Sequence, residues 1–322
     1  MPEARGLFAV ARDKIRTRHL AYRTEQAYLQ WMRRYVGYHG RRHPRKMGAP
    51  EVEAFLTHLA VDAHVSASTQ NQAMQALIFL YRQVLEIELP WLENVTRAHR
   101  PKRLPVVLSV SEVRSVLAQL EGMPWLVASL LYGGGLRLME ALRLRVKDLD
   151  LERGEIIVRA GKGAKDRVTV FPAAVSSPMR THLEKLRLRH LRQRRSGDPG
   201  VSLPAALAAK YQSASTQWGW QWVFPADSLC KDPFTRALAR RHLHERVVQR
   251  AVEAAVHRAG IVQPASCHTF RHCFATHLLA NGCDIRTVQD LLGHADVRTT
   301  MIYTHVLGMG AMGVKSPLDR TL

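Results

Sequence analysis

The sequence has little of several features that would point to particular kinds of protein. Four of its 322 residues are cysteines, and no two of them form a C-x-x-C pair (Cys230, Cys267, Cys273 and Cys283). So few cysteines predict a reducing compartment and a fold without structural disulfides. No apolar run reaches the ~20 residues that span a bilayer. The amino-terminal stretch mixes charges and lacks a long apolar segment, so we expect a cytoplasmic protein without an export signal or a membrane partner.

Acidic residues are also scarce. The chain carries 27 Asp and Glu against 47 Lys and Arg, which gives a net charge of +20. Residues 1–106 hold 17 basic and 9 acidic side chains, so the excess is shared along the chain and is not confined to a tail. This distribution favours two domains that bind one polyanion, with nucleic acid ahead of a membrane surface as the partner.

A length of 322 residues fits about two domains, and 46% apolar residues are enough to form cores. In residues 1–92, apolar side chains recur with the helical period, which predicts a helical domain. Residues 93–108 hold two prolines and several basic side chains without periodicity, so we expect a linker there. The second domain, 109–322, opens with a capping box formed by Ser109 and Glu112.

The pattern in 109–322 predicts a mainly α domain with a small antiparallel β element. Two short β-rich runs, Ile156–Val158 and Val168–Phe171, are separated by turn glycines, which is typical of a hairpin. A stretch rich in Gly, Pro, Ser and Trp covers 196–235. Three helical segments are expected after it, starting near residues 238, 268 and 285.

Two stretches place basic residues beside glycines. In "GGGLRLMEAL", Arg137 follows a glycine turn at the start of a helix, where backbone N–H groups and a guanidinium both favour an anion. Glu140, one turn later, either orients Arg137 or is solvated. In "RAGKGAKDR", Lys162 lies between two glycines at the predicted hairpin tip, where the backbone can approach a ligand closely. Taken alone, each residue has the ordinary alternative of a solvated surface side chain.

Two further stretches add histidines, an arginine and a tyrosine. "SCHTFRHCFATHL" sets His268 and Arg271 three residues apart at the start of a helix. "LLGHADVRTTMIYTHV" places His294 after a glycine and Tyr303 on a following short helix. In that helix we expect Met301 and Ile302 to take the packing positions, which would leave the Tyr303 hydroxyl free for DNA.

The pair His268 and His272, with Cys273 beside it, also allows a zinc site, because H-x-x-x-H suits a metal pair on a helix. Clear third and fourth ligands at standard spacing are lacking, and Arg271 would be an odd neighbour for a dication. We therefore expect no metal, and structural or solvated roles for His272 and His277.

Taken together, the four stretches supply the groups that phosphoryl transfer through a covalent tyrosine requires. Two arginines can neutralise the non-bridging oxygens of a pentacoordinate phosphorane, so no Mg²⁺ is needed. A tyrosine oxygen attacks in line and forms a covalent intermediate. A lysine or histidine must then protonate the departing 5′-oxygen.

In order and spacing, these four stretches closely resemble the signature boxes of the tyrosine recombinases, and the resemblance covers nearly the whole chain. It implies a two-domain DNA clamp and an active, cofactor-free enzyme that works as a tetramer on DNA in the bacterial cytoplasm, at the nucleoid. It also implies site roles: Arg137 and Arg271 hold the scissile phosphate, Lys162 is the general acid, His268 assists proton transfer, His294 bonds the phosphate and Tyr303 is the nucleophile.

Residues 196–245 form a segment longer than a plain recombinase core needs, and they resemble the added segment of integron integrases. That resemblance implies recombination of gene-cassette sites folded from one DNA strand, as well as duplex sites. An extended backbone would turn the alternating Trp218, Trp220 and Trp222 to one face, where an indole can stack on an unstacked base. The base-binding candidates are Trp220, Pro233 and His242; core or interface packing is the alternative for the tryptophans.

Three alternatives remain open at this point. The first is another tyrosine recombinase, of phage, transposon or chromosome-dimer-resolving type. The second is a DNA-binding protein without catalysis, and the third is a zinc-dependent enzyme. A carboxy-terminal helix exchanged between subunits is a further expectation, for residues 308–322.

Overall fold

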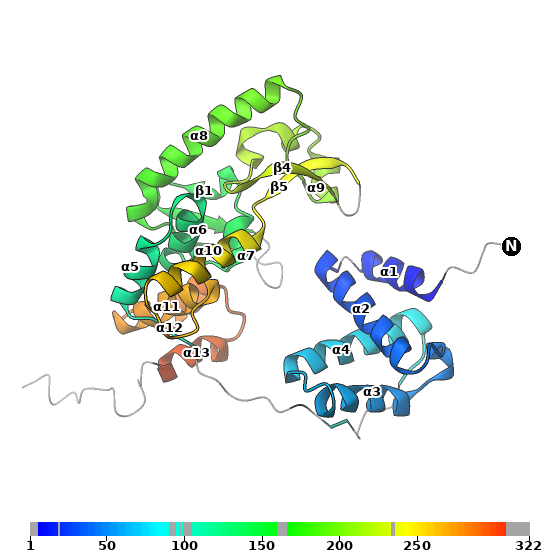
Figure 1. The fold of residues 1–322 in the computed structure, drawn as a ribbon. Coiled ribbons are helices and arrows are strands. Elements are labelled where there is room, and N and C mark those ends of the chain that lie inside the picture. The colour runs from blue at the N-terminus through cyan, green and yellow to red at the C-terminus, as the bar shows by residue number, and fades with distance from the viewer. Residues whose placement is uncertain are drawn as a thin grey trace, which may run out of the picture. The chain divides into compact units, whose positions relative to one another are not determined.

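The computed structural model describes residues 6–18, 20–89, 95–96, 98, 105–159, 166–232 and 236–306. The chain divides into two units, Met1–Arg103 and Leu104–Leu322. Both are mostly helical, and the strands of the second unit form small antiparallel sheets (Figure 1). This confirms the expected fold class. No helix in the described ranges is long and apolar enough to cross a membrane.

The amino-terminal unit is a helical bundle around one apolar core. Helix α2 buries Trp31, Met32 and Tyr35 on the face that the helical period predicts. The hydroxyl groups of Tyr35 and Tyr81 lie 2.8 Å apart within this core, so both buried polar groups have a partner. Its helices are α1 (Leu7–Thr17), α2 (Tyr22–Tyr38), α3 (Ala49–Val61) and α4 (Ala67–Phe79), followed by a π-helical stretch, Leu80–Leu85.

The first helix of the second unit begins as the sequence predicts. Ser109 Oγ accepts from the backbone N–H of Glu112 (3.2 Å), and the Glu112 carboxylate accepts from the backbone N–H of Ser109 (2.7 Å), which is the expected capping box. The antiparallel sheet that follows pairs β1 with β2 and β2 with β3. The elements are α5 (Val110–Ala118), α6 (Gly122–Gly133), α7 (Leu138–Leu142), β1 (Leu149–Asp150), β2 (Glu155–Val158) and β3 (Arg167–Val170).

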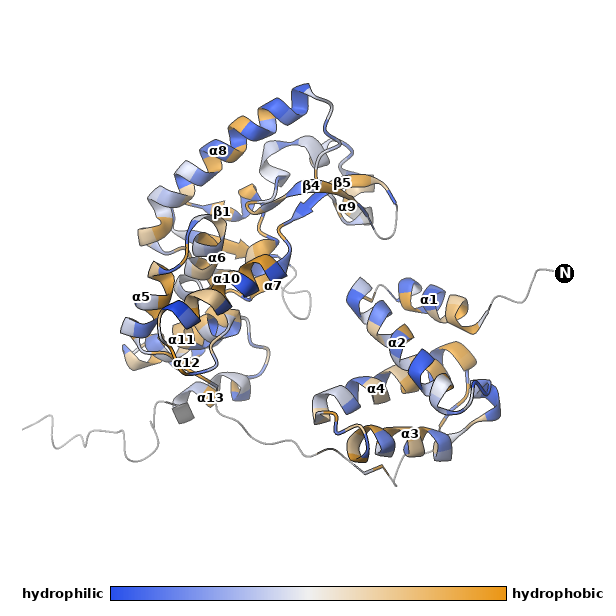
Figure 2. Ribbon diagram, in the orientation of Figure 1, coloured by the Kyte–Doolittle hydropathy of each residue, from blue (hydrophilic) through white to orange (hydrophobic). Residues whose placement is uncertain are grey.

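The remaining elements complete the core and add a second hairpin. Helix α11 packs against α6 in the main core, and its other side joins α12 and α13 in a smaller apolar cluster. Helix α8 projects along the surface, alternating between hydrophilic and hydrophobic residues (Figure 2), and buries Met179. These elements are α8 (Ser176–Arg195), α9 (Ala205–Lys210), β4 (Pro225–Lys231), β5 (Leu238–His242), α10 (Glu245–Arg258), α11 (Cys267–Ala280), α12 (Ile285–Leu292) and α13 (Val297–Val306).

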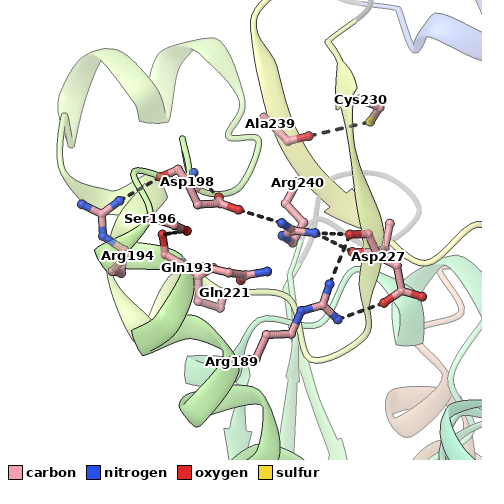
Figure 3. A network of polar contacts seen from close by, with 12 residues as sticks. Arg189, Gln193, Arg194, Ser196, Asp198, Gln221, Asp227, Cys230, Ala239 and Arg240 are labelled. Carbon is pink, nitrogen blue, oxygen red and sulfur yellow. Dashed lines mark hydrogen bonds and ion pairs between the residues drawn. The ribbon is translucent and has the colours of Figure 1, made fainter.

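One predicted element is wrong. A helix was expected from about residue 238, but 238–242 is strand β5, paired with β4, and helix α10 begins only at Glu245. Arg240 lies in this strand, where a surface helix would have left its charge solvated. Its side chain is instead buried, because the Asp198 carboxylate accepts from Nη2 (2.6 Å) and the Asp227 carbonyl accepts from Nη1 (2.6 Å), as Figure 3 shows.

Candidate active site

Arg137 is positioned by the first turn of α7. The Glu140 carboxylate accepts from the backbone N–H of Arg137 (2.9 Å) and from its Nη1 (2.7 Å). Of the two roles considered for Glu140, orientation of Arg137 is therefore the one the structure shows. The Arg137 side chain keeps 26% of its surface exposed, against 10% for Glu140, so the guanidinium can still be reached by a ligand.

Arg167, at the start of β3, is a second partner of Glu140 that the sequence analysis did not single out. Its Nη2 donates to Glu140 Oε2 (2.6 Å) and its Nη1 to Oε1 (3.1 Å). Burial opposes ionisation of Glu140, but the bonds from Arg167 and Arg137 outweigh it and lower the pKa of Glu140 to about 2. The carboxylate is therefore charged at neutral pH and fixes two guanidinium groups from different elements.

Arg271 is buried on α11, with 1% of its surface exposed. Its Nη1 donates to the carbonyl of Gly135 and its Nη2 donates to the carbonyl of Leu292 (2.6 Å). Glu140 Oε2 lies 3.8 Å from Nη1. Burial and the nearby charge of Arg137 lower the pKa of Arg271 to about 9, which leaves it a cation at neutral pH. Arg137 and Arg271, which come from different elements, therefore lie around the same carboxylate, Glu140.

The position of His294 is set by the glycine that ends the preceding helix. Gly293 ends α12 with φ of 63°, and a Cβ there would lie 2.7 Å from Arg167 Cδ, so glycine is required for conformation and for space. Arg271 Nη2 lies 3.2 Å from His294 Nε2, and Thr300 Oγ1 lies 2.9 Å from Nδ1. Because the arginine can only donate, Nε2 accepts and the proton lies on Nδ1. Burial and Arg271 lower the pKa of His294 to about 4.

Tyr303 lies on α13 with its ring packed in the cluster of α11, α12 and α13. The ring is 3% exposed and stacks at 15° to the His294 ring, with centroids 6.4 Å apart. Its hydroxyl oxygen lies 3.0 Å from Nδ1 of His272. Burial raises the pKa of Tyr303, and the charges of Arg271 and Arg137 act against that rise.

The expected packing of this short helix is wrong in two respects: Met301 is not in the core, and the Tyr303 hydroxyl is not free, because it lies against His272. Met301 was assigned to the core, but 44% of its surface is exposed, whereas Tyr303 is buried. Ile302 does pack against the cluster, as expected. Placing Tyr303 against His272 turns the helix so that residue 301 faces away, since positions two residues apart on a helix do not share a face.

The histidines of α11 make ring contacts with one another. His268 is exposed and packs edge-on against His272, with ring centroids 4.5 Å apart. Partial desolvation by neighbouring protein atoms and the charges of Arg271 and Arg137 lower the pKa of His268. Within the described residues, no group of three His, Cys, Asp or Glu side chains could hold a metal ion, so the zinc alternative lacks a third ligand there. His272, first assigned a structural or solvated role, is the partner of the tyrosine hydroxyl.

The site therefore combines three guanidinium groups with one carboxylate. Within the described residues, Glu140 is the carboxylate that pairs with Arg137, Arg167 and Arg271. Their other partners are backbone carbonyls and the neutral His294 ring, so the cluster keeps a net positive charge in a partly buried setting. Such a cluster suits an anion, because charge attraction strengthens as water is excluded. A tyrosine hydroxyl lies at its edge. Lys162, the remaining candidate, falls in 160–165, outside the described residues.

The base-binding candidates lie in a different part of the unit. Residues Trp218–Trp220 form a 3₁₀ turn, so the extended arrangement that would put three tryptophans on one face is wrong. Trp222 is buried, and its Nε1 donates to the carbonyl of Arg240 (3.0 Å). Trp220 is half-buried, with Lys147 Nζ 2.9 Å from its ring centroid.

His242 on β5 packs edge-on against Trp222, with centroids 5.4 Å apart, and its Nδ1 lies 2.8 Å from the Leu243 carbonyl. Burial lowers the pKa of His242, so the ring is neutral at neutral pH. Trp222 and His242 therefore lie together at the β4–β5 hairpin, and Trp220 is two residues before Trp222. Pro233 falls in 233–235, outside the described residues.

Both units match family models. Residues 107–308 match the phage integrase family, and residues 7–91 match the phage integrase, N-terminal SAM-like domain. The chain therefore belongs to the phage integrase family, the tyrosine recombinases.

Relatives with known names agree with this family. The chain is similar to an integrase/recombinase from Escherichia coli, at 51% identity over 308 residues that cover 96% of this chain and 91% of the relative. It is 33% identical to tyrosine recombinase XerA of Thermococcus kodakarensis over 88% of this chain and 84% of the relative. The crystal structure of XerH site-specific recombinase bound to palindromic difH substrate shares the fold, with a TM-score of 0.63 at 21% identity over 94% of this chain and 82% of that one.

Proposed function

We propose that this chain is a site-specific DNA recombinase that cuts and rejoins DNA strands through a covalent 3′-phosphotyrosyl bond. The observation that carries the proposal is the placement of the Tyr303 hydroxyl beside the Arg137–Arg271 cluster, on an element separate from either arginine. A phosphodiester bound between the arginines would bring its phosphorus within reach of a tyrosine oxygen. The +20 net charge is consistent with DNA as the partner.

Each proposed role follows from the chemistry of phosphoryl transfer. Arg137 and Arg271 bind the non-bridging oxygens, where negative charge develops in the transition state. His294 forms a hydrogen bond to the same phosphate. As the Tyr303 oxygen bonds to phosphorus, the bond to the 5′-oxygen breaks, and Lys162 supplies the proton to that oxygen while His268 assists. The 5′-hydroxyl of another strand later reverses these steps and releases Tyr303. No metal or cofactor is required.

Within the family, we propose the integron integrase type, acting on folded single-stranded and duplex cassette sites. The support is the segment 196–245, whose β4–β5 hairpin carries His242. The His242 ring packs on Trp222, two residues after Trp220. Trp220, Pro233 and His242 would hold bases pushed out of the folded strand. Another tyrosine recombinase, of phage, transposon or chromosome-dimer-resolving type, would use the same catalytic cluster without this reading of bases.

The proposed organisation follows the same lines. Residues 1–92 bind the core of the site, 93–108 connect, and 109–322 catalyse. Four protomers would assemble on two DNA sites in the cytoplasm, and the expected exchange of a carboxy-terminal helix concerns residues outside the described ranges.

Covalent trapping tests this function. A labelled cassette site, nicked so that the cleaved fragment diffuses away, is offered once as a folded single strand and once as a duplex. We expect a protein–DNA adduct on a denaturing gel, more of it from the folded strand, and none from the matched control Tyr303→Phe. An undiminished adduct from Tyr303→Phe would overturn the enzyme proposal, whereas equal adduct from both substrates would favour the other recombinase types. Adduct formation that EDTA abolishes would favour a metal enzyme.

A further inference from the structure

The hydroxyl of Tyr303 lies against a ring nitrogen of a histidine. His272 Nδ1 lies 3.0 Å from the tyrosine oxygen, within ordinary hydrogen-bond distance. The two rings are tilted at 53°, with centroids 5.6 Å apart. His272 follows Arg271 directly on α11. The arginine proposed to bind the phosphate and the histidine that contacts Tyr303 are therefore held by the same helix.

The surroundings allow the tyrosine hydroxyl to donate and the histidine to accept. Burial, His268 and Arg271 lower the pKa of His272 to about 4, so the ring is neutral at neutral pH and one of its nitrogens can accept. Burial keeps Tyr303 protonated, so its hydroxyl has a proton to give. The charged or titratable groups around the pair are His268 and Arg271 on α11, His294 beyond α12, and Arg137 before α7.

We propose that His272 positions the Tyr303 hydroxyl by accepting its hydrogen bond at Nδ1, and takes its proton when the tyrosine oxygen attacks phosphorus. The inference rests on the proposed function, because it needs Tyr303 as the nucleophile. The O–H bond of Tyr303 breaks as the O–P bond forms, and His272 becomes an imidazolium. The bond from phosphorus to the 5′-oxygen breaks, and that oxygen takes a proton from Lys162.

The same pair serves the return reaction. When a 5′-hydroxyl attacks the phosphotyrosine, its proton goes to Lys162, and His272 returns its proton to the departing tyrosine oxygen. Proton count is therefore conserved over a full cycle of cleavage and rejoining. The low pKa of His272 belongs to the DNA-free site; a bound phosphate brings negative charge next to Arg271 and raises the affinity of the ring for a proton.

The first test needs no DNA. In the full-length, ¹⁵N-histidine-labelled protein at neutral pH, NMR distinguishes a ring nitrogen that carries a proton from one that does not. We expect His272 to carry its proton on Nε2, with an Nδ1 resonance that moves in Tyr303→Phe. A proton on Nδ1, or a resonance that ignores Tyr303→Phe, would overturn the inference and leave the proposed function untouched.

The second test uses covalent trapping on the nicked, folded single-strand cassette site. His272→Ala should slow adduct formation by ~10²–10⁴-fold, and added imidazole should restore part of the rate in proportion to its free-base form. The matched control is His272→Asn, which keeps an acceptor near the Nδ1 position and fills the space; it should be slow and insensitive to imidazole.

Gel shifts and thermal unfolding check that both variants are folded and bind DNA. If His272→Ala forms adduct at the wild-type rate while Tyr303→Phe forms none, the role of His272 is refuted and the proposed function stands. A slow His272→Ala that imidazole does not restore would remove the proton-accepting step.

Discussion

Two of the buried arginines in the second unit, Arg240 and Arg271, have opposite surroundings. Arg240 meets a carboxylate of its own, Asp198, and the carbonyls of Ala226 and Asp227, while Arg189 takes the Asp227 carboxylate (Figure 3). Arg271 donates to two backbone carbonyls and contacts the His294 ring, and Glu140, 3.8 Å away, is already bonded to Arg137 and Arg167.

On the proposed function, this difference separates an arginine that completes the fold from one that binds the scissile phosphate. The buried guanidinium of Arg240 has a carboxylate of its own, Asp198, as the cost of burying charge demands. Arg271 shares the single carboxylate of Glu140 with Arg137 and Arg167, which leaves an excess of positive charge for an anion to compensate. Charge balance within a cluster thus distinguishes two side chains that burial alone would group together.

Replacing each arginine by lysine should produce the largest contrast. Lysine keeps the charge but loses the planar fork, so Arg271→Lys should reduce covalent adduct formation by ~10³–10⁵-fold. Both Arg271→Lys and Arg240→Lys leave carbonyls without donors and should lower the thermal midpoint. Measured where both variants remain folded, cleavage should be lost only in Arg271→Lys. Equal cleavage in the two variants would mean that charge balance does not mark the active site.

Lys162 extends the comparison to the leaving group. If it protonates the 5′-oxygen, Lys162→Ala should slow single-turnover cleavage by ~10²–10⁴-fold. A 5′-phosphorothiolate substrate needs no such proton and should return the rate close to that of the wild type. Arg271→Lys is the matched control, because its defect lies at the non-bridging oxygens and should persist with the sulfur substrate. A Lys162→Ala enzyme that stays slow on sulfur would be inconsistent with a general acid.

Glu140 should make the unbalanced cluster sensitive to acid. Its pKa of about 2 in the folded chain lies below the ordinary value of 4.5, so the stability it adds is complete above pH 4.5 and is lost as the pH falls toward 2. Glu140→Gln should lower the thermal midpoint at pH 6, and the gap from wild type should narrow between pH 5 and pH 3. A gap that stays constant over this window would show that the carboxylate charge does not stabilise the cluster.

Sequence patterns were reliable where a local rule sets the structure and failed where distant partners do. The capping box at Ser109 and Glu112 depends on residues three apart, and the structure has it. The helix expected from 238 failed because Arg240 is neutralised by Asp198, forty-two residues earlier.

The candidate site shows the same division. The order of motifs pointed to Arg137 and Arg271, whereas Arg167 and His272 acquire meaning only through Glu140 and Tyr303. Arg167 is the last residue of the quoted "RAGKGAKDR". Glu140, a carboxylate with several arginines close to it in the sequence, would have been the signal to look for. Nothing local marks His272, because its partner lies on another helix.

The smallest expected effect comes from the tryptophans, and it compares two neighbours that differ in their surroundings. Trp222 is buried, bonded to the Arg240 carbonyl and covered by Arg145, so Trp222→Ala should mainly lower the thermal midpoint. Trp220 is half-buried and has Lys147 over its ring, a partner that an unstacked base could displace because the lysine is exposed. Trp220→Ala should therefore keep stability but lose ~1–3 kcal/mol of binding to a folded single-strand site, the typical worth of one stacked base. Gel shifts with the folded single strand and with the same site as a duplex measure this loss of binding. The loss should nearly vanish on the duplex. Equal losses on both substrates would assign Trp220 to general DNA binding, and a loss only in Trp222→Ala would move the base platform to the other ring.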